Sequence, residues 1–194
     1  MSKLALDTLQ LGSSATASQN LVIKTNKDGT FTIARGNEGA TTQDLLTIDA
    51  AGKIDLPQTR VPVFSAYANA LLNAAHATWT KILFQVEEFD SHDIYNTSTS
   101  RCQPNLPGYY YFIASVEFEN PSYCTASIGK NGSNETKRGA YVQGYNILAE
   151  SVLYMNGTTD YVEVNGYQQS GATQHVIYNN GPYTFFQGFL IREA

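Results

Sequence analysis

Residues 107–118 constrain the fold of this chain more than any other stretch. A Pro-Gly turn leads into a run of aromatic and β-branched residues, the pattern that begins a β-strand. Side chains alternate between the two faces of a strand, so the run divides into two sets. The first set is entirely apolar and predicts a β-sandwich core: Tyr110, Phe112, Ala114, Val116 and Phe118. The second set is too aromatic for ordinary solvent and too polar for a core: Tyr109, Tyr111, Ile113, Ser115 and Glu117. We interpret it as a surface that meets another subunit; the alternative is a strand buried on both faces within one chain.

The composition agrees with an all-β protein and excludes some partners. Charged residues make up 15% of the 194 residues, while tyrosine (13) and glycine (15) are abundant. The net charge of −5 argues against a nucleic-acid partner. No apolar run approaches the roughly 20 residues of a membrane helix, so no membrane insertion is expected. Cys102 and Cys124 are too few for a disulfide framework, and no secretory signal is visible. We therefore expect free thiols, with a bridge between them as the alternative.

Residues 1–58 form a predicted β-hairpin region with little core of its own. Strands at 20–25 and 30–34 flank a turn that ends in Gly29, and strands at 45–49 and 53–56 flank a turn that ends in Gly52. An isolated hairpin is marginal in water, so this region requires either the C-terminal domain or copies from other chains. Residues 1–11 are expected to be a short strand or an attachment peptide.

Residues 60–194 are predicted to form one larger β-domain. The expected strands are 62–67, 79–86, 109–118, 123–129, 139–145, 147–155, 160–168, 174–178 and 184–192. Many short strands at this spacing are typical of a sandwich or jelly roll. The Ala- and Asn-rich residues 67–77 are the exception, and we expect a loop there with modest helical tendency.

Four segments of this domain resemble the C1q/tumour-necrosis-factor-like family, in the same order along the chain. The segments are Val63–Tyr67, Tyr95–Asn96 followed by residues 107–112, residues 152–164, and the closing residues 185–191. The resemblance implies a ten-strand jelly roll that assembles as a homotrimer, with the strand at 109–118 and the closing strand facing the three-fold axis. Combined with the alternation above, it predicts a trimer interface made of Tyr109, Tyr111, Ile113, Phe186 and Leu190.

A second resemblance concerns the N-terminal region. Residues 46–57 are similar to the shaft repeats of bacteriophage tail and head fibres, in which strand–turn–strand units stack in trimers, and residues 23–36 are of the same type. This resemblance implies that residues 1–58 attach the protein to other virion proteins.

No cluster of residues in the sequence indicates catalysis. Residues 90–93 contain potential metal ligands, but a solvated loop is the simpler interpretation. Glu117 and Glu119, or the carboxylates at 87–90, could be paired acids for glycoside cleavage, but a solvated strand edge explains them as well. No catalytic or metal residues and no cofactor are assigned. Some C1q-like trimers hold calcium, through carboxylates that do not map onto this sequence.

The loops instead indicate a binding surface. They are rich in Tyr, Asn, Gln, Ser and Gly, a composition that combines rigid aromatic contacts with adaptable hydrogen bonds. The candidate ligand-binding residues are Tyr141, Tyr145, Tyr167, Tyr178 and Tyr183. The alternative is that these loops only cover sheet edges.

The expected function is that of a trimeric bacteriophage fibre or spike protein, made in the host cytoplasm and located in the virion. Its C1q-like head would bind a glycan or protein on the bacterial surface. The alternative is a capsid decoration or head-fibre protein with a structural role alone. A glycan-degrading enzyme is a third, less favoured hypothesis.

Overall fold

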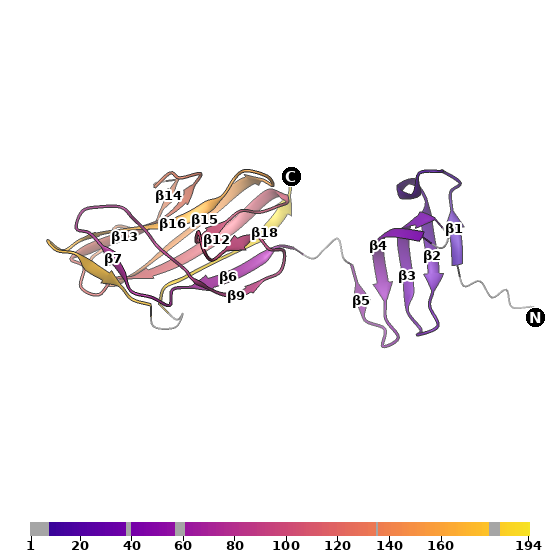
Figure 1. The fold of residues 1–194 in the computed structure, drawn as a ribbon, viewed down its shortest axis with the longest axis horizontal. Helices are drawn as coiled ribbons and strands as arrows, with labels where there is room; N and C mark the ends of the chain where they lie inside the picture. The colour runs from indigo at the N-terminus through magenta and orange to yellow at the C-terminus, as the bar shows by residue number, and fades with distance from the viewer. Residues whose placement is uncertain (1–7, 38–39, 57–60, 135, 179–182) are drawn as a thin grey trace, which may run out of the picture. The chain divides into compact units, whose positions relative to one another are not determined.

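The structure, a computed structural model, describes residues 8–37, 40–56, 61–134, 136–178 and 183–194. The chain divides into two compact units, Met1–Arg60 and Val61–Ala194, which are described separately (Figure 1). The predicted domain boundary at residues 58–60, and residues 1–7 of the predicted attachment peptide, lie outside the described residues.

The N-terminal unit is a single antiparallel sheet whose five strands follow chain order. Its elements are β1 (Thr8–Leu11), η1 (Ala17–Gln19), β2 (Leu21–Thr25), β3 (Phe31–Asn37), β4 (Ala40–Ile48) and β5 (Ile54–Asp55). Both predicted turns are present, with Gly29 and Gly52 at φ values of 86° and 83° that favour glycine. The turns also share a hydrogen-bond pattern: the Gly29 amide donates to the Asn26 carbonyl, and the Gly52 amide to the Asp49 carbonyl. The two predicted hairpins are thus parts of one sheet, because β3 also pairs with β4.

One face of this sheet is apolar across all five strands. Cross-strand partners lie on the same face, and two sets of partners are apolar throughout. The first set is Leu9, Ile23, Ile33 and Leu46, and the second is Phe31, Ile48 and Ile54. Leu9 and Ile54 are 44% and 60% exposed, and the others are half-buried. The apolar face is therefore only partly covered within one chain.

The C-terminal unit is a β-sandwich (Figure 1). One sheet has the order β15-β12-β18-β6-β9, and the other has the order β10-β11-β16-β13-β14 with β8 beside β16. The strands of the first sheet are β6 (Val63–Tyr67), β9 (Val86–Asp90), β12 (Pro107–Glu117), β15 (Asn146–Asn156) and β18 (Phe185–Glu193). Those of the second are β8 (Thr80–Lys81), β10 (Tyr95–Asn96), β11 (Arg101–Cys102), β13 (Tyr123–Lys130), β14 (Lys137–Arg138) and β16 (Val162–Gln169). A separate pair joins β7 (Leu72–Ala74) to β17 (Gln174–Val176).

Several segments differ from the sequence prediction, which had no strand at β10, β11 or β14 and none over most of β9. The strand expected at 139–145 is absent; only Val142 makes a bridge there, to Cys124. A Cβ atom on Gly139 would lie 2.3 Å from the Leu148 carbonyl oxygen, so the chain passes too close to β15 for a regular strand residue. The strand expected at 79–86 shortens to β8 because the chain turns to bury Ile82 and Phe84 in the core. Residues 72–74 form β7 rather than a helical turn.

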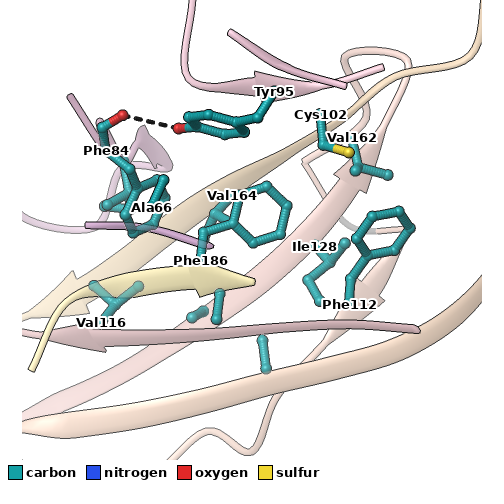
Figure 2. Close-up of a cluster of buried hydrophobic side chains, with 14 of the residues drawn as sticks. Ala66, Phe84, Tyr95, Cys102, Phe112, Val116, Ile128, Val162, Val164 and Phe186 are labelled. Atoms are coloured by element: carbon teal, nitrogen blue, oxygen red, sulfur yellow. Dashed lines mark hydrogen bonds between the residues drawn. The ribbon is translucent and has the colours of Figure 1, made fainter. Parts of the chain in front are cut away.

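The core between the two sheets confirms the predicted inward face of residues 107–118. All five of those residues have no exposed surface: Tyr110, Phe112, Ala114, Val116 and Phe118. Figure 2 shows Phe112 and Phe186 among aliphatic side chains of both sheets, and Tyr95 donating a hydrogen bond to the Phe84 carbonyl at 2.8 Å. Burial raises the pKa of the Tyr95 hydroxyl, which remains a donor at all ordinary pH values. Both cysteines are buried free thiols, as expected.

The closing strand β18 corrects one part of the predicted interface. Phe186 and Leu190 were expected between subunits, but they are 0% and 3% exposed and belong to the core of the single chain. The reason is register: Phe186 pairs with Ala114 and Leu190 with Tyr110, both on the inward face of β12. The prediction for these two residues is wrong, and the other apolar set of β18, Phe185, Phe189 and Ile191, takes their place on the outward side.

Candidate functional site

The outward face of the β15-β12-β18 sheet carries a group of exposed apolar side chains. Its exposed side chains are Tyr109 (45%), Leu148 (55%), Val152 (51%), Tyr154 (44%), Phe189 (43%) and Ile191 (50%). We call this set the apolar face. Tyr111 and Ile113, half-buried, lie within it. The structure therefore places the predicted residues Tyr109, Tyr111 and Ile113 on one outward surface.

Aromatic pairs give this face a defined shape. The rings of Tyr109 and Tyr154 have centroids 5.6 Å apart, and those of Tyr111 and Phe189 are 5.5 Å apart. The Tyr111 hydroxyl donates to the Glu150 carboxylate, and this hydrogen bond raises the pKa of Tyr111. Over β6 the surface becomes polar, because Gln187 donates to the Ser65 hydroxyl and Ser65 to the Glu88 carboxylate. On β9, Phe89 pairs with Ser65 and is 50% exposed. Isolated apolar residues are normal on protein surfaces, whereas a group of neighbouring exposed ones is a candidate interaction site.

The outward face of the second sheet carries a different surface, a row of four aromatic rings. Trp79 and Tyr167 have centroids 5.4 Å apart, Tyr167 and Tyr141 6.4 Å, and Tyr141 and Tyr123 5.4 Å. The row crosses the strands, because Trp79 precedes β8, Tyr167 lies in β16, Tyr123 in β13, and Tyr141 precedes the bridge between Val142 and Cys124. We call these four residues the aromatic row.

The aromatic row brings together two of the five predicted loop tyrosines. Tyr141 and Tyr167 belong to it, whereas Tyr145, Tyr178 and Tyr183 do not. Tyr145 and Tyr183 are exposed where β12 meets β15: the Phe118 amide donates to the Tyr145 carbonyl, and the Ser115 hydroxyl to the Tyr183 carbonyl. Tyr178 is exposed beside residues 179–182, which lie outside the described part of the chain.

Sequence reasoning missed Trp79 and Tyr123 as site residues. Both were assigned to ordinary strands, and neither lies in a Tyr/Asn-rich loop. The available signal was that Trp79 is the only tryptophan of the chain. Its contact with Tyr167 depends on the pairing of β8 with β16, which spacing in the sequence does not reveal.

Three ion pairs hold the strands of this sheet to neighbouring segments. Glu163 of β16, with a side chain only 8% exposed, accepts from Lys81 at 2.6 Å and from Arg101 at 2.9 Å. Burial would raise the pKa of the Glu163 carboxyl, but the hydrogen bonds from Lys81 and Arg101 outweigh it and the pKa is lowered. Asp160 accepts from Lys130 at 2.7 Å; burial opposes its ionisation, but bonds from Asn131, Lys130 and the Asn156 amide lower its pKa.

A polar cleft of about 400 Å³ lies between the β9–β12 connection and the β15–β16 turn. Its lining includes Asp93, Asn96, Arg101, Gln103 and Thr158. Gln103 donates across it to the Thr158 carbonyl, and Arg101 is held over the Tyr161 ring at 4.0 Å. These contacts hold the two segments together, so the polar side chains that make them have a structural role in the cleft.

The residues considered for chemistry have local structural roles. The Asp90 carboxylate accepts the backbone amides of His92 and Tyr95, and the Ser91 hydroxyl bonds the His92 ring, so residues 90–93 form a hydrogen-bonded turn. Within the described ranges, no three His, Cys, Asp or Glu side chains are grouped as metal ligands would be. No helix in the same ranges has the length and apolarity to cross a membrane.

Solved structures of other proteins are similar to this chain over about two thirds of its length. Murine APRIL, in crystal structures at pH 8.5 and pH 8.0, gives a TM-score of 0.51 at 12% and 13% identity, over 68% of this chain and all of that chain. The globular domain of zebrafish complement 1qA protein gives 0.49 at 17% identity, over 70% of this chain and all of its own. No family model matches the sequence, and no curated protein does. At such identities the likeness concerns the fold alone: the β-sandwich of this chain is similar in fold to C1q/TNF-like domains.

Proposed function

We propose that this chain is a homotrimeric binding module in which the apolar face lies between subunits. The observation that carries the proposal is the outward surface of β15, β12 and β18, where six large side chains are more than 40% exposed in one chain. Burying such a set gains roughly 25 cal/mol per Å² of apolar surface removed from water. Domains with the C1q/TNF-like fold are typically non-enzymatic binding modules and usually trimerise, which supports this assembly.

The N-terminal sheet supports the same assembly. Its apolar face, including Leu9, Ile23, Ile33 and Ile54, is only partly covered within one chain. A single sheet layer needs a second layer to be stable. Copies of the same sheet from two other chains provide that layer, as expected for a fibre shaft.

The combination of a small N-terminal sheet and a jelly-roll-like head is the basis for a proposed biological setting. We infer a bacteriophage fibre or spike protein of the virion, with residues 1–58 held by other virion proteins and the head turned toward the bacterial surface. A trimer presents three equivalent sites, so weak binding at each becomes strong attachment without new contacts. A capsid decoration protein would share the trimer but lack the binding surface, so binding to host cells separates the two.

The experiment that tests the trimer is the mass of the full chain by light scattering at micromolar concentration. The wild-type chain is expected at three times its 21.3 kDa. Phe189→Asp is expected to dissociate it, because three carboxylates would be buried between subunits. The matched control is Tyr123→Asp on the other sheet, since the two side chains are 43% and 44% exposed.

The control variant is expected to stay trimeric. A monomeric wild-type chain would contradict the proposal. So would a Phe189→Asp variant that keeps both its trimeric mass and its circular-dichroism spectrum, because the apolar face would then lie outside the subunit contact.

A further inference from the structure

The two sheets of the sandwich present outward surfaces of different chemistry. The apolar face mixes aromatic rings with Leu148, Val152 and Ile191. On the strands of the second sheet, the described residues include no exposed large aliphatic side chain, and Tyr123 is the exposed large apolar residue. The aromatic row thus offers ring faces beside polar side chains, without the exposed aliphatic area of the apolar face.

Hydrogen bonds hold the rings of the aromatic row in place. The Tyr141 hydroxyl donates to the Gln169 amide oxygen, and the Gln169 amide nitrogen donates to the Tyr167 hydroxyl at 3.2 Å. The rings of Tyr123 and Tyr141 are nearly parallel, at 13°. Gln169 thus links two rings through one amide, and its position beside them places polar groups next to aromatic faces. Side chains fixed before binding lose little entropy when a ligand arrives.

The shape of the row favours an extended ligand. Strands of a sheet lie about 4.8 Å apart, and the row runs from Trp79 beside β8, over β16, to Tyr141 beyond β13. Successive ring centroids along this path are 5.4 Å apart from Trp79 to Tyr167 and 6.4 Å apart from Tyr167 to Tyr141. Two such steps span more than one sugar ring.

Charge distinguishes among the ligands that stack on aromatic rings. Nucleic-acid bases do so, but their binding depends on cationic side chains that neutralise phosphates. Here the chain carries a net charge of −5, and the lysine of β8 is already paired with Glu163. The same charge balance disfavours acidic polysaccharides. A neutral sugar is not repelled by the negative charge of the chain. Its C–H groups can pack on the negative face of an aromatic ring, and its hydroxyls can form hydrogen bonds with amide and phenol groups.

We propose that the aromatic row Trp79–Tyr167–Tyr141–Tyr123, with Gln169, is a binding site for an extended neutral glycan. This inference deepens the proposed binding role of the head and rests on it. Sugar rings stack on the exposed faces of Tyr123 and Tyr141, which are 44% and 49% exposed. Their hydroxyl groups bond to Gln169 and to the tyrosine hydroxyls. In the trimer the row lies on the sheet opposite the subunit contact, so all three copies stay accessible.

The test uses the full-length trimer and a panel of purified bacterial capsular and O-antigen polysaccharides, neutral and acidic, immobilised on a surface. We expect saturable binding to at least one neutral polysaccharide. The same polysaccharide is then titrated in solution while the fluorescence of Trp79, the only tryptophan, reports contact at the row itself. Tyr141→Ala and Tyr123→Ala are each expected to weaken binding at least about ten-fold, the effect of losing one stacked ring.

Two further variants separate the roles of ring and position. Tyr141→Phe keeps the ring but loses the hydroxyl that bonds Gln169 and is proposed to bond the sugar, so its affinity should lie between that of the wild type and that of Tyr141→Ala. Tyr145→Ala removes an exposed tyrosine (58%) outside the row and should bind as the wild type does. The inference is overturned if no neutral polysaccharide binds, if only acidic ones do, or if Tyr145→Ala weakens binding as much as Tyr141→Ala. Light scattering on every variant keeps this outcome distinct from a failure of the trimer.

Discussion

Glu163 forms two ion pairs within the second sheet. It joins β16 to Lys81 of β8 and Arg101 of β11, and its carboxylate is largely withdrawn from water. Its pKa, like that of Asp160, is lowered in the folded protein. Each carboxylate therefore contributes stability that is present above its ordinary pKa, 4.5 for Glu163 and 3.8 for Asp160, and that is lost as pH falls through the lower pKa of the folded protein.

We expect the urea midpoint to fall as the pH is lowered from about 5 to about 3, because the unfolded chain binds more protons there. Glu163→Gln should lower the free energy of unfolding at pH 7 by roughly 1.5–3 kcal/mol, the contribution of a charged hydrogen bond. It should also flatten the acid dependence, leaving the part due to Asp160. Equilibrium unfolding at a series of pH values measures both. Glu119→Gln, at an exposed position, is the control; an equal effect there would show that net charge rather than the ion pair is responsible.

At the scale of the element, β18 depends on one glycine. Gly188 pairs with Phe112 on one side and Phe64 on the other. A Cβ atom there would lie 2.6 Å from a Phe112 ring carbon and 2.8 Å from a Phe64 ring carbon. The space beside Gly188 is thus filled by core rings of the same chain, which lets β18 lie between β12 and β6.

Gly188→Ala is therefore expected to destabilise the sandwich by about 1–3 kcal/mol, because one added methyl group overpacks a dense aromatic core. Chemical denaturation of the purified variant measures the change. Gly144→Ala provides the comparison, since a Cβ atom at Gly144 has nothing within 4 Å. A Gly188→Ala variant as stable as Gly144→Ala would mean that the core rings move aside at no cost.

At the scale of the whole molecule, stability and assembly should be linked. A trimer that forms only from folded chains gains stability with concentration by mass action. We expect the thermal midpoint of the wild-type chain to rise as protein concentration is increased a hundred-fold, and that of Phe189→Asp to stay constant at a lower value. Scanning calorimetry over that range tests the link. A wild-type midpoint independent of concentration would be incompatible with folding coupled to assembly.

Much of the fold could be predicted because its signals are local. The alternation of β12 follows from the two-residue period of a strand, so its core residues were identified without neighbours. The turns at Gly29 and Gly52 follow from their residue types. The prediction of a strand at 139–145 was wrong. The chain passes close to Leu148 of β15 at Gly139, and this contact is not visible in the local sequence.

Patterns within the sequence were thus enough to predict an all-β chain, the positions of most of its longer strands, and the inward face of β12. Which apolar set of β18 points inward depends instead on the register against β12, which places Phe186 inward and Phe189 outward. The contact of Trp79 with Tyr167 in the aromatic row likewise depends on the pairing of β8 with β16. The physical reason is range: alternation is set by the backbone of a few residues, whereas register and cross-sheet contact are set by pairing between residues far apart in the chain.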